Sequence, residues 1–499
     1  MPDRRTPRLA ATLVFLATLA AYLVTAGGSL GTQDAVAVYF QTTSIVDRGA
    51  IDVPLEISGE KWLGVDGRYH LPFGIGQAVY NVPFYLAGKA VVRATGLKVS
   101  GSAEPVLKAC VALGSTVAAA AAVAFTFLLA WRLTGSVSAS LMCAVLLAFG
   151  TPMWLYGKFG FNTALTAATL TIGTYGLLVG RLTQRMAPYA WGAAALAFAV
   201  LTRHEMALAG LAALLWVAFS GTQRWDRRIR AALVVGSILA ASAAAWMGFN
   251  WWRFGNPLEA GHSPTFGVVG FAGLLVSPAA SLFVYAPIAT IGLVGVSRLW
   301  KERHPSGTLF TLVGIVLFVF YASLEDWIGT RSYGPRYLVP LLPMLCAAAP
   351  IGLRGLADRF KRARALYLAV VALSVLVQLP SVAVNFVTVR GLSSAPTANQ
   401  APFSWASAPV VLNTQAMGPA LAANWDAWHG RIPTAFAAAG TAALPGGSDL
   451  SSKLSFSFDF WWLYLYYLGK LTAATALLAP AGLTVISALL FRRAAVLRT

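Results

Sequence analysis

A carboxylate near the start of the chain has the clearest potential for chemistry. Asp34 stands in Gly31-Thr-Gln-Asp34-Ala-Val-Ala-Val-Tyr39, a few residues after the first long apolar segment. Charged groups next to a membrane are costly to keep there and are therefore candidates for function. A carboxylate at a bilayer surface can act as a general base that takes the proton from an attacking hydroxyl group. A second role, compatible with the first, is as the N-cap of a helix over residues 35–48.

Arginines beside later apolar segments are candidates for binding an anion. Arg331 and Arg336 lie in segment 325–337, which is dense in polar and aromatic residues. The planar guanidinium fork matches phosphate oxygens, so we expect this segment to bind a phosphate or pyrophosphate group. The alternative is an ion pair with Asp326 that closes the loop. Arg253 follows two tryptophans and either holds a lipid phosphate at headgroup depth or snorkels within an aromatic belt.

Other polar residues fall in the same expected outer segments. Lys158 lies at an outer turn and is a further candidate for the phosphate, and Asp66-Gly67 is typical of a hairpin turn. Arg203-His204-Glu205 marks an outer helix break, where polar groups line a cavity rather than face lipid. Each loop charge has the alternative reading of a solvated side chain. The residues expected to line the site are Tyr39, Lys61, Arg68, Tyr69, His70, Arg203, Glu205, His262, Asp326, Trp327, Tyr333 and Tyr337.

The composition predicts the kind of protein that must position these residues. Of 499 residues, 58% are hydrophobic and 11% are charged, and the mean hydropathy is +0.67. Soluble domains contain roughly a quarter charged residues. The net charge of +19 lies in short loops between apolar runs, so a nucleic-acid partner is not expected. The three cysteines lie inside apolar runs without metal-ligand spacing and are expected to be buried small hydrophobic residues.

The apolar runs predict an all-α polytopic membrane protein of about twelve spans, because roughly 20 apolar residues cross a bilayer. The first is expected to be an uncleaved span. The predicted spans are 9–27, 105–131, 136–156, 161–180, 189–202, 205–220, 231–249, 283–299, 308–324, 338–353, 365–386 and 466–491.

Basic residues give these spans an orientation. With the predicted spans, the basic loops all fall on one side, which is the cytoplasm by the positive-inside bias. Both termini are therefore expected in the cytoplasm. The basic residues are Arg4, Arg5, Arg8, Arg132, Arg181, Arg185, Arg224, Arg227, Arg228, Arg230, Lys301, Arg303, Arg354, Arg359, Lys361, Arg362, Arg364, Arg492, Arg493 and Arg498.

Two long outer segments follow from this topology. Residues 28–104 form the first extracytoplasmic loop, with an interfacial helix expected over 73–92. Residues 387–465 are expected to form a small outer cap, and Ser277-Pro278 a break in another outer loop. We therefore divide the chain into a transmembrane catalytic module over 1–386, the cap, and a last span with a cytoplasmic tail over 466–499.

Several function classes lack their sequence signals. The chain has no Walker loop, nucleophile elbow or HExxH motif. It has no Rossmann-type phosphate loop, so a cytosolic nucleotide sugar is not an expected substrate. Neither a short-period repeat nor the matching halves of many transporters is apparent.

The blocks around these residues resemble the GT-C superfamily of membrane glycosyltransferases, in particular the bacterial branch similar to protein O-mannosyltransferases and the lipid A aminoarabinose transferase. The resemblance covers about the first 340 residues. It rests on Asp34 after the first span, on Ser44-Ile-Val-Asp-Arg-Gly-Ala-Ile-Asp-Val-Pro54, and on Gly74-Ile-Gly-Gln77 with Pro83-Phe-Tyr. Later blocks are Arg253-Phe-Gly-Asn-Pro, Ser277-Pro and Ser332-Tyr-Gly-Pro-Arg336-Tyr.

The resemblance implies inverting transfer of a sugar from a polyprenyl-phosphate carrier to a lipid, glycan or protein acceptor. The reaction would take place at the outer face of the bacterial plasma membrane. The role of the family's acidic residue, which acts as base or positions the acceptor, carries over to Asp34. Many relatives have a second acidic residue directly after it, whereas Ala35 follows here, so no essential metal or other cofactor is predicted. The phosphate role of Arg253, Arg331, Arg336 and Lys158 is inferred from charge and sidedness alone. The main alternative is a multi-span transporter or flippase of a lipid-linked sugar.

Overall fold

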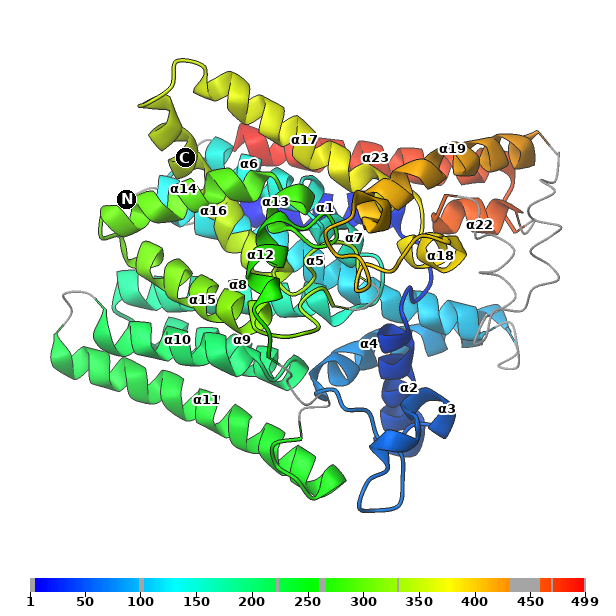
Figure 1. Ribbon diagram of the computed structural model, residues 1–499, viewed down its shortest axis with the longest axis horizontal. Helices are drawn as coiled ribbons and strands as arrows, with labels where there is room; N and C mark the ends of the chain where they lie inside the picture. Colours follow the sequence, from blue (N-terminus) through cyan, green and yellow to red (C-terminus); the bar gives the residue numbers. More distant parts are fainter. Residues whose placement is uncertain are drawn as a thin grey trace.

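The computed structural model describes residues 5–97, 103–220, 224–259, 266–329, 332–429, 458–467 and 470–497. In these ranges the regular secondary structure is helical, apart from isolated antiparallel bridges between Leu63 and Tyr69 and between Phe266 and Leu324. The longest helices lie roughly side by side along one direction (Figure 1). The fold is thus that of an all-α polytopic membrane protein, as predicted.

Helices occupy all twelve predicted spans, but not all are equally long. Eight of the described helices are long and apolar enough to cross a membrane, α16 when counted with the turn before it. They are α1 (Arg5–Thr25), α5 (Glu104–Thr134), α8 (Asn162–Thr183), α11 (Trp225–Phe254), α15 (Pro305–Ala322), α16 (Leu342–Ala357), α17 (Ala363–Ala383) and α23 (Ala473–Val496). The other four positions hold α6 (Val137–Phe149), α9 (Met186–Thr202), α10 (Met206–Phe219) and α14 (Ile288–Lys301).

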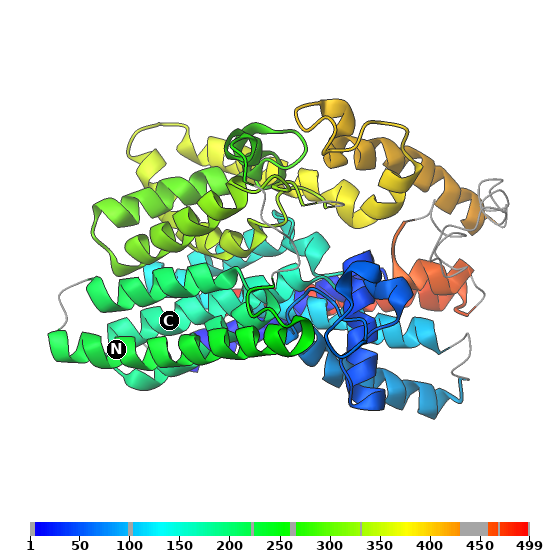
Figure 2. The same ribbon diagram turned by 60° about the horizontal axis from the view of Figure 1, so that its bottom comes forward.

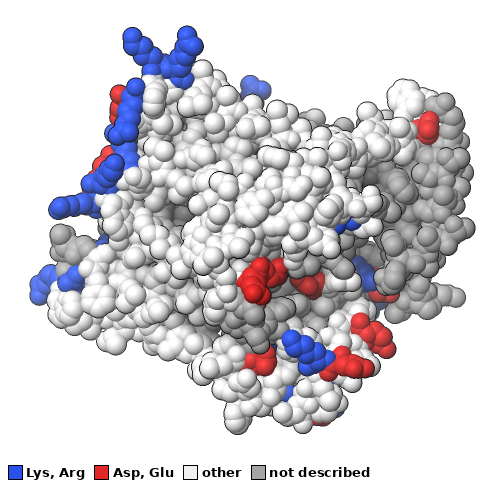
Figure 3. Space-filling view, in the orientation of Figure 1, with Lys and Arg blue, Asp and Glu red and all other residues white. Residues whose placement is uncertain are grey.

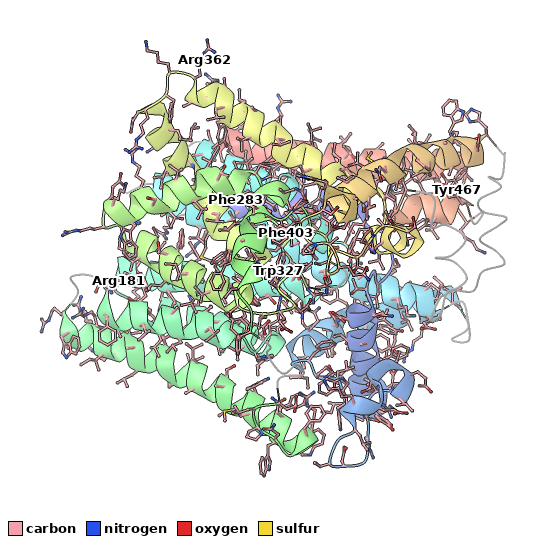
Figure 4. All side chains as sticks on the ribbon, viewed as in Figure 1. Arg181, Phe283, Trp327, Arg362, Phe403 and Tyr467 are labelled. Carbon is pink, nitrogen blue, oxygen red and sulfur yellow. The ribbon has the colours of Figure 1, made fainter. Side chains whose placement is uncertain are left out.

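Basic side chains gather at one end of the helix bundle. Arg132, Arg181, Lys301, Arg354 and Arg493 stand in the last turns of α5, α8, α14, α16 and α23. Both chain termini lie at this end (Figures 1 and 2), and Lys and Arg side chains cover its edge (Figure 3). Arg362 projects there from the turn between α16 and α17 (Figure 4). We call this end the basic end. Its assignment to the cytoplasm stays a prediction.

The first long loop folds into helices at the opposite end of the bundle (Figures 1 and 2). It contains α2 (Gln33–Arg48), α3 (Leu55–Ser58), the short 3-10 helix η1 (Glu60–Trp62) and α4 (Gly76–Thr95). The helix predicted over 73–92 is therefore present as α4. It packs antiparallel to α5, with Gly88 against Leu107 and Gly114 against Asn81. Its expected interfacial position stays a prediction.

The remaining described helices are short, apart from the 20-residue α19. These are α7 (Met153–Tyr156), α12 (Val269–Val276), α13 (Leu282–Tyr285), η2 (Val339–Leu341), α18 (Phe386–Leu392), η3 (Trp405–Ser407), α19 (Pro409–Trp428) and α22 (Trp461–Tyr467). The predicted Ser277-Pro278 break falls between α12 and α13. The expected cap contains α18, η3, α19 and α22, while its residues 430–457 lie outside the described part of the chain.

Candidate active site

Asp34 lies in the first turn of α2, with its side chain partly exposed. Thr32, and not Asp34, is the N-cap: its hydroxyl accepts a hydrogen bond from the amide of Ala35 at 3.2 Å. The predicted helix is correct, but the predicted cap residue is wrong. Thr32 stands at the helix boundary with extended backbone angles, whereas Asp34 already lies in the first turn. The Asp34 side chain is 47% exposed, so its carboxylate remains accessible for chemistry.

Arg336 lies beside this carboxylate although about 300 residues separate the two in sequence. Its Nη1 is 3.7 Å from Oδ2 of Asp34, and its Nη2 donates to the Tyr337 hydroxyl at 3.2 Å. The guanidinium carbon lies 5.1 Å from the centre of the Phe161 ring. Burial lowers the pKa of Arg336, but Tyr337 and Asp34 raise it, and the net pKa lies above the usual value. Arg336 is therefore a fixed cation at the site.

Gly329 makes room for this arginine. The glycine has a φ of +70°, which favours glycine, and a side-chain carbon added there would meet Nε of Arg336 at 2.5 Å. The Nε atom is buried without a hydrogen-bond partner among the described residues. A buried N–H group without a partner is costly. This donor is therefore a candidate for binding an anion.

A second arginine comes from the turn between α9 and α10. Nη2 of Arg203 lies 2.6 Å from Oε1 of Glu205, which also accepts a hydrogen bond from the Tyr321 hydroxyl at 3.1 Å. Tyr321 and Tyr337 stack with ring centres 4.8 Å apart, and the Arg203 guanidinium covers both rings at 5.5 and 5.1 Å. Nη1 of Arg203 is buried without a partner in the described chain.

These charges influence one another. Burial raises the pKa of Glu205, whereas Arg203 and His204 lower it to a net value of about 2. Burial lowers the pKa of Arg203, but Glu205 raises it, and the net pKa lies above the usual value. The charge of Arg203 in turn lowers the pKa of Arg336. The two guanidinium groups are thus close enough to repel, and an anion bound between them would relieve that repulsion.

Two glycines bring the first loop against this arginine turn. A side-chain carbon added at Gly74 or Gly76 would overlap backbone atoms of Leu201 or Thr202 at the end of α9. The beginning of α4 can therefore approach the residue before Arg203 only because both positions are glycine. This close contact explains why the Gly74-Ile-Gly-Gln77 block has glycine at positions 74 and 76.

An apolar groove opens near the loop that carries Arg336. Its volume is about 810 Å³, and it lies between α12, α13, α17 and α19. The Tyr333 hydroxyl donates to the carbonyl of Val377, one of the groove-lining residues, at 2.8 Å. Figure 4 shows Phe283, another lining residue, on α13 near the middle of the molecule. Tyr333 stands three residues before Arg336, so one loop connects the groove with Arg336.

Lys158 is not available to a phosphate, contrary to the prediction. Its ammonium group is 3.0 Å from Oδ2 of Asp459 and donates to the carbonyls of Asp459 and Val382 at 2.8 Å each. An ammonium group has three donors, and these contacts use all of them. The sequence offered no signal for Asp459 as the partner, because 300 residues separate the two.

Arg253 also has a structural environment. Its side chain is fully buried and donates to the carbonyls of Leu71 and Phe73 and to the side-chain oxygen of Asn250. The guanidinium covers the rings of Phe249 and Phe254. Arg253 therefore connects the first loop to the end of α11. Both predicted roles, binding a lipid phosphate and snorkelling in an aromatic belt, are wrong for this buried side chain.

The hairpin in the first loop is present as predicted, around Asp66 and Gly67. Asp66 accepts from the Arg68 amide at 3.0 Å and lies 3.1 Å from Nε2 of the buried His70. Lys61 and Arg68 are exposed, Lys61 over the Trp62 ring and Arg68 3.9 Å from Asp52. Tyr69 is half-buried. None of these contacts reaches Asp34 or Arg336.

The remaining predicted residues divide between core and site. Tyr39 is buried against Tyr85, and the buried Tyr333 packs edge-on against Tyr285. Trp327 packs over Gly270 and Gly273 and lies near Phe403 (Figure 4). Asp326 accepts from the Tyr337 hydroxyl at 3.5 Å and so adjoins the site. Arg331 and His262 lie outside the described residues.

Sequence reasoning missed two aromatic residues of the site. Phe161 lies beneath Arg336, and Tyr321 lies beneath Arg203. Tyr321 ends an apolar helix, where a tyrosine is common at any membrane interface. Neither position carries a sequence signal that distinguishes it from an ordinary aromatic residue.

The cysteines and possible metal ligands add no further site among the described residues. Cys143 and Cys346 are buried, Cys110 is half-buried, and none forms a disulfide. No group of three or more His, Cys, Asp or Glu side chains there could hold a metal ion. The absence of an essential metal stays a prediction.

Comparison with known proteins gives similarity at the level of the fold. No family model and no curated sequence matches this chain. ArnT from Cupriavidus metallidurans in the apo state is 14% identical over 97% of this chain and 76% of its own, with a TM-score of 0.44. The oligosaccharyltransferase AglB from Archaeoglobus fulgidus, in complex with an inhibitory peptide and a dolichol-phosphate, is 12% identical over 88% of this chain and 60% of its own, with a TM-score of 0.47.

The arabinosyltransferase EmbB from Mycobacterium smegmatis is 12% identical over 96% of this chain and 41% of its own, with a TM-score of 0.41. This chain therefore spans less than two thirds of AglB and of EmbB. Similarity at these identities and TM-scores assigns no activity to the chain.

Proposed function

We propose that this protein is an inverting glycosyltransferase. It moves a sugar from a polyprenyl-phosphate donor to a lipid, glycan or protein acceptor at the extracytoplasmic face of a bacterial plasma membrane. The observation that carries the proposal is the half-exposed Asp34 carboxylate 3.7 Å from the buried Arg336 guanidinium. The reaction class comes from the GT-C resemblance of the blocks around these residues.

Arg336 and Arg203 are the proposed phosphate-binding groups. Both are largely buried, and each has an N–H group without a partner in the described chain. Charge-assisted hydrogen bonds from guanidinium groups to phosphate are strong, and donors fixed in place stabilise charge that develops during a reaction. In this proposal the arginines stabilise the negative charge that grows on the leaving polyprenyl phosphate.

The apolar groove is the proposed site of the prenyl chain. Its lining is mostly apolar, with Leu275, Val276, Phe283, Val284 and Leu373 among the contributors. Through Tyr333, the groove connects to the loop that carries Arg336. In this proposal, a lipid chain in the groove places its phosphate near Arg336.

Asp34 is the proposed general base. It takes the proton of the acceptor hydroxyl while the hydroxyl oxygen forms a bond to the anomeric carbon. The bond between that carbon and the phosphate oxygen breaks, and polyprenyl phosphate leaves with the electron pair. Attack from the face opposite the leaving group inverts the configuration. Asp34 can meet the acceptor because half of its side chain is exposed.

The test compares two isosteric substitutions on the same helix. Asp34→Asn removes the base and should lower kcat for sugar transfer by roughly 10²- to 10⁴-fold. Binding of polyprenyl phosphate should change by only a few-fold, because the arginines remain. Asp47→Asn is the matched control. Asp47 lies at the far end of α2, where it pairs with Lys89 and Tyr85, and its variant should keep normal turnover.

Two outcomes would contradict the proposal. One is unchanged turnover of the Asp34→Asn protein. The other is transport of a lipid-linked sugar by reconstituted vesicles with no covalent product, which would favour the transporter alternative.

A further inference from the structure

A buried ion pair joins two distant parts of the chain next to the candidate site. The side chains of Lys158 and Asp459 are 1% and 2% exposed, and their charged atoms are 3.0 Å apart. Burial lowers the pKa of Lys158, although Asp459 acts to raise it. Lys158 lies in the turn between α7 and α8, and Asp459 lies just before α22. Removing one partner of a buried ion pair is strongly destabilising, because the other charge is left buried without compensation.

The same turn supports the backbone that leads into α2. The amide of Gly31 donates to the carbonyl of Phe159 at 3.2 Å, and a side-chain carbon on Gly31 would overlap the Phe159 ring. Gly160, with a φ of +71°, packs against Leu30 and Ala35. The residues on both sides of Asp34 thus rest on the two residues that follow Lys158.

The turn also supports Arg336. Phe161 provides the ring beneath the Arg336 guanidinium. The Tyr156 hydroxyl, two residues before Lys158, donates to the carbonyl of Tyr333 at 3.1 Å. Residues 156–161 therefore contact both the segment that carries the base and the loop that carries the phosphate-binding arginine.

Asp459 comes from a well-anchored segment near the C-terminus. Its amide donates to the carbonyl of Ala383 at 2.8 Å, and the amide of Trp461 donates to Ala26 at 2.9 Å. The indole groups of Trp461 and Trp462 donate to carbonyls near the end of α1 at 2.8 Å each. The segment thus ties the end of α1, the end of α17 and the turn after α7 to one another.

We propose that the Lys158–Asp459 pair is a positioning element that fixes residues 156–161 so that Asp34 and Arg336 stay paired. The C-terminal segment is then part of the support of the active site. This inference rests on the proposed function, because the reaction affected by the pair is the proposed sugar transfer. Neither Lys158 nor Asp459 touches the substrate in this scheme, and both act through Phe159 and Phe161.

The activity test uses Asp459→Asn, which removes the charge and keeps the shape. We expect kcat per folded molecule to fall about 10-fold or more, since misplacement by about 1 Å costs up to 10²-fold. The KM for the donor should rise by a smaller factor than kcat falls, because Arg336 shifts while Arg203 and the groove are untouched. Phe159→Leu leaves the ion pair intact and should reproduce the loss of kcat, which keeps the inference testable if Asp459→Asn folds poorly.

The matched control is Ser487→Ala in the C-terminal helix α23. Ser487 is buried, and its hydroxyl donates to the carbonyl of Ala17 in α1 at 2.8 Å. This variant should lower Tm but leave kcat unchanged, because its hydrogen bond joins α23 to α1 and involves neither the groove nor residues 156–161. If Asp459→Asn and Phe159→Leu also lowered only Tm, the pair would be merely structural and the inference would be wrong.

A second measurement does not depend on catalysis. Hydrogen exchange of the amides at 31–35 should be faster in Asp459→Asn than in the wild-type protein and unchanged in Ser487→Ala. If the wild-type protein transferred no sugar, the proposed function would fail, yet this exchange would still report on positioning. Unchanged exchange in Asp459→Asn would overturn the inference whatever the activity.

Discussion

The balance between exposed and buried charge at the candidate site decides what it can bind. Asp34 is half-exposed, whereas Arg203 and Arg336 are largely buried and stacked on aromatic rings. The carboxylate can therefore exchange partners with solvent or substrate, but the guanidinium groups cannot turn away. Nη1 of Arg203 and Nε of Arg336 are therefore fixed donors that can bind an acceptor from a ligand.

The fork of Arg336 should matter more than its charge. Arg336→Lys keeps the positive charge but loses the planar set of donors. We expect the affinity for a polyprenyl phosphate to fall about 10- to 100-fold, equivalent to about 1.4–3 kcal/mol, as measured by titration of the purified protein. Arg68→Lys on the exposed hairpin is the control and should bind normally. Equal affinity of the Arg336→Lys and wild-type proteins would remove Arg336 from the phosphate site.

The pair of Arg203 and Glu205 predicts a pH dependence of stability. The pKa of Glu205 falls from 4.5 to about 2 in the folded protein. A depressed carboxyl pKa stabilises the fold above the unfolded pKa, and the contribution is lost as the pH falls toward 2. The shift corresponds to on the order of 3 kcal/mol.

Thermal unfolding between pH 6 and pH 3 tests this expectation. Glu205→Gln should have a lower Tm than the wild-type protein at pH 6, because Arg203 loses its partner. The Tm of the variant should then depend less on pH over this range. Parallel curves for the two proteins would show that Glu205 is not held ionised by Arg203.

At the scale of elements, small residues decide how closely the helices pack. In α14 and α16, side-chain carbons added at Gly292, Gly295 or Gly352 would overlap backbone atoms of the facing helix. Close backbone approach through small residues is typical of helix packing in membranes, where burial from water does not drive association. Because α16 begins shortly after Arg336, this packing supports one end of the loop that carries Arg336.

Glycine substitutions test this packing with a control in the neighbouring helix. Gly295→Val would meet the backbone of Ala348, and overpacking of this kind typically costs about 1–3 kcal/mol. We expect a clear loss of thermal stability in detergent. Gly314→Val in α15 should change the Tm little, since nothing lies within 4 Å of the added carbon. A normal Tm for Gly295→Val would mean that the two helices can separate without cost.

For the whole molecule, the distribution of charge is the main asymmetry. Lys and Arg gather at the end that holds both termini (Figure 3), while Asp34, Arg203 and Arg336 lie among the turns at the other end. Positive charge near span ends is retained on the cytoplasmic side. The site should then face the extracytoplasmic side.

Reporter fusions test this orientation. A fluorescent protein fused after Thr499 should be fluorescent, because it folds in the cytoplasm, whereas alkaline phosphatase at the same position should be inactive. Phosphatase inserted in the exposed hairpin at Gly67 should be active. The opposite pattern would place Asp34 in the cytoplasm and would exclude an extracytoplasmic donor.

The sequence by itself determined where the helices lie and which end carries the basic residues. Apolar run length, loop charge and turn residues act locally, so each predicted span holds a helix and Asp66-Gly67 forms a turn. The accessibility of Asp34 close to the first span also followed from local pattern.

Only the tertiary structure decided the partner of each charged side chain. By sequence, Lys158 and Arg253 were candidates for binding phosphate just as Arg336 was. In the structure Lys158 pairs with Asp459, and Arg253 donates to a carbonyl of the first loop and to Asn250. Arg336 alone of the three lies beside Asp34. The physical reason is that helix formation and membrane insertion depend on neighbours along the chain. Ion pairing and burial depend on which turns, hundreds of residues apart, the packing of the helices brings together.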